Sequence, residues 1–184
     1  MALCENNTSH NCEERAEKRQ ATHNAPYHHV GSGLDNVYLI GITYYVCPDC
    51  GTQAAEIPAM KSLFEALGRT IIEKRSRITG PELRFLRKRL AKKAVEFAPM
   101  ISLTPETLSS LENKAAPIDP SRDKLVRLVF RGLSGDKQLR HVFDKGREFE
   151  RWLASISGDG REERIYARRL RNNQWKVDVE ALAA

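Results

Sequence analysis

Cysteines at a short, regular spacing are the residues of this chain best suited to chemistry. In Cys47-Pro48-Asp49-Cys50-Gly51, two thiols stand at the C-x2-C spacing that grips one tetrahedral Zn²⁺ from a tight turn. The glycine that follows lets backbone amides turn toward sulfur. Cys4 and Cys12 are available to complete the ligand set, although their spacing is wider than in most zinc knuckles. We therefore expect one structural Zn²⁺ bound by Cys4, Cys12, Cys47 and Cys50.

Other uses of these thiols fit the sequence less well. His10 is the alternative that would replace one of the cysteines as a ligand. A redox C-x-x-C pair needs its first cysteine at a helix N-terminus, whereas here a strand-like segment enters the motif and a glycine turn leaves it. A catalytic zinc needs an open position and a general base. We find no nucleophile–base pair or phosphate loop with supporting context, and we expect the protein not to be an enzyme.

Composition limits the class of protein. The chain has 184 residues, 41% of them apolar and 7% aromatic, which fits one large domain or two small ones. The longest apolar stretch, residues 37–46, is interrupted by Gly41 and is too short to cross a bilayer. The N-terminal residues lack the apolar segment of a signal peptide. We expect a cytoplasmic protein without a membrane partner, in a reducing compartment that disfavours structural disulfides.

Positive charge is concentrated in residues 69–93. The net charge of the chain is +6, yet residues 1–68 carry four basic and eight acidic side chains. Residues 69–93 carry ten basic and two acidic side chains. Such a concentration suits phosphate or an acidic partner. The alternative is an ordinary solvated helix face.

The middle of the chain begins with a strand pattern that changes to a helical one. Residues 37–46 are β-formers around Gly41, which predicts a short hairpin whose second strand leads into Cys47. Pro58 is typical of a first helical position. The apolar residues that follow recur at helical spacing and predict a connecting helix over 58–78: Leu63, Phe64, Leu67, Ile71 and Ile72.

Residues 79–131 have the pattern of a small helical domain. Thr79 and Glu82 stand at capping-box spacing and begin a basic helix. Short helices over 94–100 and 104–113, joined by a three-residue turn, have helix-turn-helix proportions. Leu108 and Leu111 would face the core. A fourth helix starts at Asp119 or Ser121, and a generic helical bundle is the alternative.

The C-terminal segment predicts one more helix and a second hairpin. Apolar side chains at helical spacing indicate the helix: Phe143, Phe149, Trp152, Leu153 and Ile156. Residues 165–170 and 175–179 alternate around Asn172-Asn173, which is a hairpin signal. This segment has more apolar surface than we expect so short a tail to bury, so we expect it at a dimer interface.

The expected fold class is α+β with four parts. They are a small N-terminal zinc-binding β-hairpin domain (1–57), a connecting helix (58–78), an all-α helix-turn-helix domain (79–131) and a C-terminal extension of a helix plus a β-hairpin (132–184), which we expect to support dimerisation.

Several of these segments resemble one family. GLDNVYL with CPDCG, the later ITGPELRFLRKRL, and a helix-turn-helix ending in SSLEN are similar to the MqsA-type antitoxins. These regulators have a YgiT-type zinc finger and an Xre/Cro-type domain. The resemblance covers roughly residues 1–130. It implies an N-terminal zinc domain that holds a toxin, a dimeric DNA-binding domain, and repression of the protein's own operon.

The resemblance and the charge pattern together select the candidate DNA contacts. The basic run would touch phosphates through Arg84, Arg87, Lys88, Lys92 and Lys93. The second short helix would read bases through Thr104, Glu106, Thr107, Ser109, Ser110 and Asn113. The chain departs from the family where Lys93-Ala94 replaces Ser-Gln, where Ser102 replaces the glycine of the turn, and where Glu106 and Ser110 stand in place of Asn and Arg.

The sequence therefore predicts a homodimeric, zinc-containing transcription regulator that binds operator DNA and resembles an antitoxin with a possible toxin partner. Because the base-reading positions depart from the family, a second hypothesis remains. It is a zinc-containing protein–protein adaptor whose helix-turn-helix no longer reads DNA.

Overall fold

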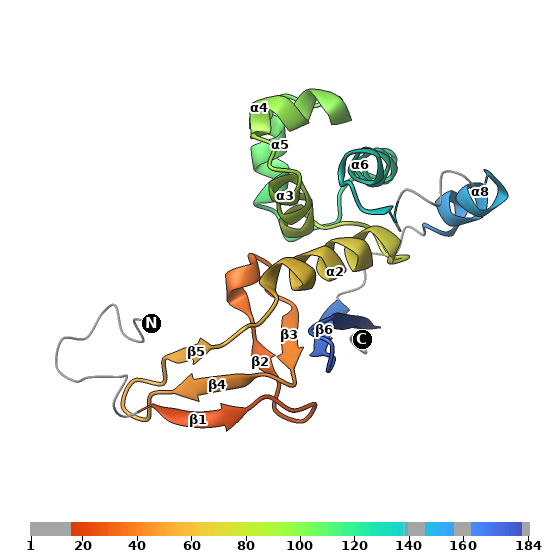
Figure 1. The fold of residues 1–184 in the computed structure, drawn as a ribbon. Coiled ribbons are helices and arrows are strands. Elements are labelled where there is room, and N and C mark those ends of the chain that lie inside the picture. The colour runs from red at the N-terminus through yellow and green to blue at the C-terminus, as the bar shows by residue number, and fades with distance from the viewer. Residues whose placement is uncertain (1–15, 138, 140–145, 157–162, 182–184) are drawn as a thin grey trace.

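The computed structural model describes residues 16–137, Leu139, 146–156 and 163–181, which form a mixed α and β fold (Figure 1). The expected α+β class is confirmed. The strands are β1 (Glu17–Gln20), β2 (Tyr27–His28), β3 (Val37–Ile40), β4 (Thr43–Val46), β5 (Gln53–Ala55), β6 (Glu163–Arg169) and β7 (Trp175–Ala181). The helices are η1 (Val30–Ser32), α2 (Met60–Glu73), α3 (Gly80–Arg89), α4 (Ala94–Phe97), η2 (Ala98–Ile101), α5 (Pro105–Glu112), α6 (Pro120–Leu133) and α8 (Gly146–Ser155).

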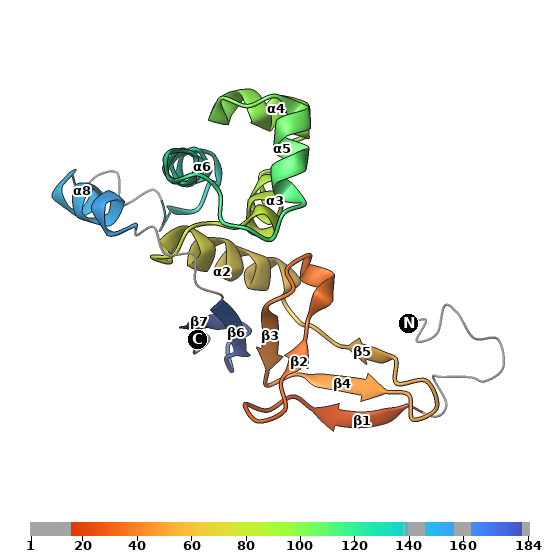
Figure 2. The same ribbon diagram turned by 180° about the vertical axis from the view of Figure 1, so that it is seen from behind.

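The long helix α2 separates two layers of structure. The sheets lie on one side of α2, and the helical unit formed by α3 to α6 lies on the other (Figures 1 and 2). Buried apolar residues of the sheets, α2 and the helical unit belong to one continuous cluster, which includes Leu39, Leu67, Leu83 and Val126. One hydrophobic core therefore crosses the boundaries of the four expected parts.

The strands form two sheets, with the orders β1-β4-β5 and β2-β3-β6-β7. The expected hairpin over residues 37–46 is wrong, because β3 and β4 lie in different sheets. Gly41 has a positive φ of 80°, and its N–H donates to the carbonyl of Ala21 at 2.9 Å. Ile42, which is buried, accepts in turn from the Ala21 N–H. The link between the strands therefore pairs with Ala21, and the chain turns away from β3.

The C-terminal hairpin completes the second sheet. The turn predicted at Asn172-Asn173 joins β6 to β7, and β6 pairs in parallel with β3, with Val37 opposite Ile165. Ile165, Ala167 and Trp175 are buried within the same chain. The expectation that this segment had too much apolar surface to bury internally is therefore wrong for the hairpin, because β3 and α2 cover it.

Helix α2 is shorter than the sequence suggested. It begins at Met60 because Ala59 adopts a left-handed conformation (φ 50°), which leaves Pro58 outside the helix. It ends at Glu73, not near Ile78, because Lys74 is extended. The apolar positions of the helix face the core as the spacing predicted, with Leu63, Leu67 and Ile71 fully buried.

The helical unit begins its helices where the sequence predicted. The Thr79 N–H donates to Glu82 Oε2 at 2.7 Å, which closes the capping box of α3. Thr104 caps α5, and Asp119 caps α6 by accepting from the N–H groups of Ser121 and Arg122. The helix expected over 94–100 is present as α4 continued by η2. Of the C-terminal helix, α8 is described and Phe143 lies outside the described residues.

No helix in the described part of the chain is both long and apolar enough to span a bilayer.

Candidate functional site

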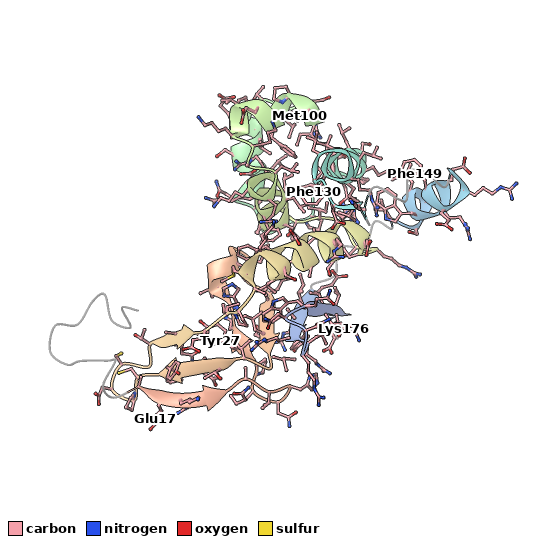
Figure 3. The ribbon with its side chains drawn as sticks, viewed as in Figure 1. Glu17, Tyr27, Met100, Phe130, Phe149 and Lys176 are labelled. Carbon is pink, nitrogen blue, oxygen red and sulfur yellow. The ribbon has the colours of Figure 1, made fainter. Side chains whose placement is uncertain are left out.

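Helix α5 presents a polar, solvent-exposed face at one end of the molecule. Leu108 is fully buried and Leu111 is half-buried, so both point toward the helical unit as the spacing predicted. The residues expected to read bases are all exposed: Thr104, Glu106, Thr107, Ser109, Ser110 and Asn113. Met100 on η2 and Glu17 on β1 mark opposite ends of the structure (Figure 3). The helix-turn-helix therefore stands away from the β1-β4-β5 sheet.

The turn between η2 and α5 holds a strained residue. Ser102 adopts a left-handed conformation with φ 57° and ψ 45°. Its N–H donates to Pro99 O at 3.2 Å, and the Leu103 N–H donates to Ala98 O at 2.9 Å, so the turn is fixed by backbone hydrogen bonds. A side chain in this conformation costs roughly 1–2 kcal/mol, which a glycine would avoid. The chain therefore makes this left-handed turn between η2 and α5 with a serine, where a glycine would be less strained.

Local hydrogen bonds within α5 occupy part of its polar face. Thr104 Oγ1 accepts from the Thr107 N–H at 3.3 Å, and the two threonine hydroxyls lie 3.1 Å apart. Asn113 Nδ2 donates to Ser109 O at 2.9 Å. The pKa of Glu106 is held below its ordinary value, first because its own backbone N–H donates to the carboxylate and second because the Thr104 hydroxyl does. The N-terminus of α5 therefore carries a stable negative charge near neutral pH.

Arg87, which we expected to contact phosphate, is half-buried and bonded within the protein. Its Nε and Nη2 donate to Glu112 Oε1 and Oε2 at 2.6 and 2.7 Å, and its Nη1 donates to Lys92 O at 2.9 Å. The two side chains are 13% and 5% exposed. The hydrogen bond to Glu112 raises the pKa of Arg87, although burial opposes this. The Arg87 guanidinium therefore joins α3 to α5, and its contact with DNA phosphate stays a prediction.

The other predicted basic contacts remain on the surface. Arg84 and Lys88 are exposed on α3, Lys93 is exposed just before α4, and Lys92 is half-buried. Arg89, which is not among the predicted DNA contacts, places its guanidinium 5.8 Å from the ring centre of Phe64. The exposed basic surface beside the helix-turn-helix therefore consists of Arg84, Lys88 and Lys93, with partial access to Lys92.

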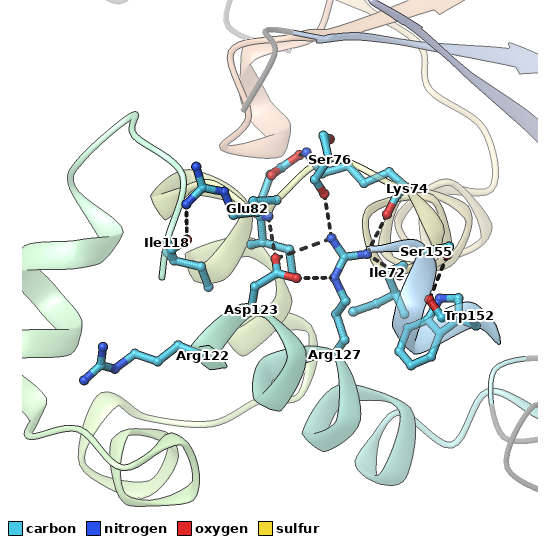
Figure 4. A network of polar contacts seen from close by, with 12 residues as sticks. Ile72, Lys74, Ser76, Glu82, Ile118, Arg122, Asp123, Arg127, Trp152 and Ser155 are labelled. Carbon is cyan, nitrogen blue, oxygen red and sulfur yellow. Dashed lines mark hydrogen bonds and ion pairs between the residues drawn. The ribbon is translucent and has the colours of Figure 1, made fainter. Parts of the chain in front are cut away.

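A buried ion pair that the sequence reading missed connects α6 to the end of α2 (Figure 4). Asp123 and Arg127 are fully buried, and Arg127 Nε donates to Asp123 Oδ2 at 2.8 Å. The Arg127 guanidinium also donates to the carbonyls of Ile72, Lys74 and Ser76 at 2.6 to 2.7 Å. It thereby satisfies carbonyls at the C-terminal end of α2 that have no helical partner. The i,i+4 spacing of Asp123 and Arg127 is the feature of the sequence that could have predicted this ion pair.

A second set of charges fixes the helical unit to the sheets. Lys74 Nζ lies 2.8 Å from Glu82 Oε1 on α3 and 3.3 Å from Glu163 Oε2 on β6. The Asp123 carboxylate accepts from the Ile78 N–H at 2.6 Å. Residues 74–79 are therefore bonded to α3, α6 and β6 at once. We call this region the junction, and it sets the position of the helix-turn-helix relative to the sheets.

The two described cysteines lie on a tight turn at the end of β4. The Cys47 N–H donates to Thr52 O at 3.0 Å, and the Gly51 N–H donates to Cys47 O at 2.8 Å, with Gly51 at a φ of 71°. Cys47 is buried and Cys50 is exposed, with its Sγ 3.2 Å from Thr52 Oγ1. A strand does lead into Cys47, and a glycine allows the turn. This backbone fits a zinc knuckle.

The segment that holds the other two cysteines enters the fold beside this turn. Glu17, the first residue of β1, pairs with Val46, the residue before Cys47. Four residues lie between Cys12 and Glu17 in the sequence, so an extended chain can span at most roughly 17 Å between the two. Cys4, Cys12 and His10 lie outside the described residues. Within the described ranges, no group of three or more His, Cys, Asp or Glu residues could hold a metal ion.

Of the three histidines that the structure describes, one is buried. His23 and His28 are exposed, but His29 is only 6% exposed, and its Nε2 has no hydrogen-bond partner in the structure. Burial lowers the pKa of His29, and the neighbouring His28 lowers it further. His29, which directly follows β2, is therefore a buried residue that is neutral near pH 7.

No protein-family model, curated protein or solved structure matches this chain.

Proposed function

We propose that this protein is a DNA-binding transcription regulator whose α4–η2–α5 segment is a helix-turn-helix. The observation that carries the proposal is the exposed polar face of α5 beside the exposed cations Arg84, Lys88 and Lys93. A capped helix preceded by a tight left-handed turn supports the same reading.

In this proposal, the basic surface around α3 and the polar face of α5 contact different parts of the DNA. The cations on α3 and before α4 contact phosphates, which positions the protein but carries no sequence information. Helix α5 enters the major groove. It contains no Arg or Lys, so it makes no bidentate contact to guanine. Its hydroxyls discriminate weakly between sequences, by about 10- to 100-fold if one or two contacts of ~1–3 kcal/mol form. The Glu106 carboxylate accepts from cytosine N4 or repels phosphate.

We further propose that the cysteine end of the molecule holds one structural zinc. Cys47 and Cys50 supply two thiolates from the turn after β4, and Cys4 and Cys12 supply the other two. A closed four-thiolate site contributes to folding and supplies no catalysis. With the resemblance to MqsA-type antitoxins, this gives an antitoxin-like repressor of its own operon, with the zinc domain available to a toxin.

The adaptor hypothesis is supported by two observations at the helix-turn-helix. Glu106 places an ionised carboxylate where DNA phosphates would approach, and Arg87 is engaged by Glu112. An adaptor would keep the scaffold for a protein partner and bind no DNA.

Fluorescence anisotropy distinguishes the two functions. The full-length protein is titrated at low salt onto labelled duplex from upstream of its own coding region and onto a scrambled duplex of equal length. The regulator hypothesis predicts binding to both, with modestly tighter binding to the upstream sequence. No binding to either duplex at low salt would leave the adaptor as the better account.

A further inference from the structure

Strand β7 is the last strand of its sheet, and one of its two edges has no neighbouring strand among the described residues. It spans seven residues, Trp175–Ala181, and is the last strand in the order β2-β3-β6-β7. Within the described ranges, no strand pairs with its outer edge. Long edge strands normally carry a device that prevents pairing with another chain, such as a proline, a bulge, an inward-pointing charge or exposed charged side chains, which a partner must then match with opposite charges. Residues 175–181 contain no proline, and their charged side chains alternate with apolar ones.

The hydrogen-bond phase of the hairpin shows which backbone groups face outward. The Leu170 N–H donates to Gln174 O at 2.8 Å, so residue 174 is bonded toward β6. The Ile165 N–H donates to Asn36 O, away from its β7 neighbour Val179. Because pairs alternate along an antiparallel ladder, the N–H and C=O groups of Trp175, Val177 and Val179 point to the open edge.

The side chains of β7 separate by charge and burial. Lys176 and Asp178 project to the outer face, where their side chains are 64% and 50% exposed. Val177 and Val179 lie on the inner face, packed against the core but only half-buried. The edge therefore offers a row of outward backbone groups flanked by two incompletely covered valines.

We propose that β7 pairs antiparallel with β7 of a second copy of this chain, about a two-fold axis at Val177. The axis can lie at a hydrogen-bonded or a non-hydrogen-bonded pair, so residues with inward backbone groups must be considered too. An axis at Lys176, Asp178 or Glu180 would set that charge opposite its own copy, and like charges directly opposite each other destabilise the pairing. This leaves Trp175, Val177 and Val179. An axis at Val179 would set Asp178 opposite Glu180 twice, and like charges there destabilise the pairing. An axis at Trp175 would have to pair turn residues. An axis at Val177 sets Lys176 opposite the partner's Asp178 twice, which is complementary.

The same register joins the apolar residues of the inner face, which are the buried Trp175 and the half-buried Val177 and Val179. Val177 meets its own copy, and Trp175 lies opposite the partner's Val179, so the inner face continues across the axis. The four-stranded sheets of the two copies, each with the order β2-β3-β6-β7, become one sheet of eight strands. Lys176 Nζ already lies 3.5 Å from Asp178 Oδ1 of its own strand, which places its charge near the axis. This interface lies outside the helix-turn-helix and does not depend on DNA binding.

Disulfide trapping tests the register in the full-length chain. Two residues that exchange hydrogen bonds across the axis have Cα atoms about 5.5 Å apart, within disulfide range. Val177→Cys should therefore give a covalent dimer of about twice the 20.9 kDa chain mass under mild oxidation. Val179→Cys, on the same face with similar burial, should not, because it lies opposite Trp175. Wild-type protein reports any cross-linking through the native cysteines.

Charge exchange provides a second test that does not require oxidation. Lys176→Asp should weaken the dimer at least about tenfold, because two attractive pairs become repulsive. Lys176→Asp combined with Asp178→Lys should restore it. Glu180→Lys changes a charge that faces Gln174 in this register, so it should have little effect. Sedimentation analysis gives the dissociation constants. A monomer at tens of micromolar, or a dimer in which Val177→Cys does not cross-link, would overturn the proposal.

Discussion

Arg87 and Glu112 form a two-point ion pair that joins α3 to α5, with donor–acceptor distances of 2.6 and 2.7 Å. Arg87, one of the basic residues of 69–93, therefore has a structural contact within the protein. The pair holds α5 against α3, the helix that carries Arg84 and Lys88.

Removing one member of this pair should destabilise the helical unit. Arg87→Ala leaves the Glu112 carboxylate buried without its partner, which we expect to cost roughly 3 kcal/mol, since Arg87 retains some exposure. Arg87→Met combined with Glu112→Leu should recover most of that loss. Urea unfolding monitored by circular dichroism measures both. A change below about 0.5 kcal/mol in Arg87→Ala would show that the pair is not structural.

Ser102 should be replaceable by glycine with a gain in stability. Its φ of 57° is unfavourable for any residue with a Cβ, so Ser102→Gly should raise the free energy of unfolding by about 1 kcal/mol. The same change at Ser110, inside helix α5, should instead lower it by about 0.5 kcal/mol. Thermal unfolding of both variants checks the contrast. Equal effects at the two positions would mean that Ser102 does not adopt the left-handed conformation described above.

The buried His29 should make stability fall at acidic pH. Its pKa is below the ordinary value of about 6.5 in the folded state, so the unfolded chain binds more protons below that pH. Stability contributed by neutral His29 is therefore present above about pH 6.5 and is lost as the pH decreases toward the folded pKa. Unfolding of His29→Leu should depend less on pH between 7 and 5 than unfolding of the wild type. The exposed His23→Leu variant is the control, and an identical slope in all three would contradict this role.

Zinc should bind at one equivalent per chain through four thiolates. Elemental analysis of the native protein and thiol counting before and after chelation give the stoichiometry. Cys47→Ser should lose zinc and disorder the β1-β4-β5 sheet while the helical unit keeps its helicity, because small zinc sites depend on metal for stability. Asp49→Asn, which changes no thiol of the same turn, should keep zinc. Less than half an equivalent in the wild type would argue against the site.

Local signals in the sequence predicted local structure well. Thr104 and Asp119 accept from helix N–H groups next to them in the chain, and Glu82 accepts from the Thr79 N–H three residues before it. These patterns can be read without knowing the fold. The C-terminal hairpin and the turn after Cys47 are set in the same way by Asn172-Asn173 and Gly51.

Contacts between distant segments were not readable from the sequence. The pairing of β3 with β6 joins residues more than 120 positions apart, and it separates β3 from β4 although only two residues lie between them. The role of Arg87 depends on Glu112, which lies on another helix. Helical periodicity predicts the two helices but does not show that these two side chains meet. Helix α2 ends at Glu73, and Arg127 from α6 donates to the carbonyls of Ile72 and Lys74 at that end, a contact between residues far apart in the sequence.

The salt dependence of DNA binding tests the central claim most directly. The measurement is the slope of log K against log salt concentration for the wild type, for Arg84→Ala/Lys88→Ala, and for the matched pair Lys18→Ala/Arg19→Ala on exposed strand β1. Each phosphate contact releases counterions, so losing Arg84 and Lys88 should reduce the slope by about 2, while the β1 variant should keep the wild-type slope. Equal slopes in all three proteins, or no DNA binding by the wild type at low salt, would contradict the account.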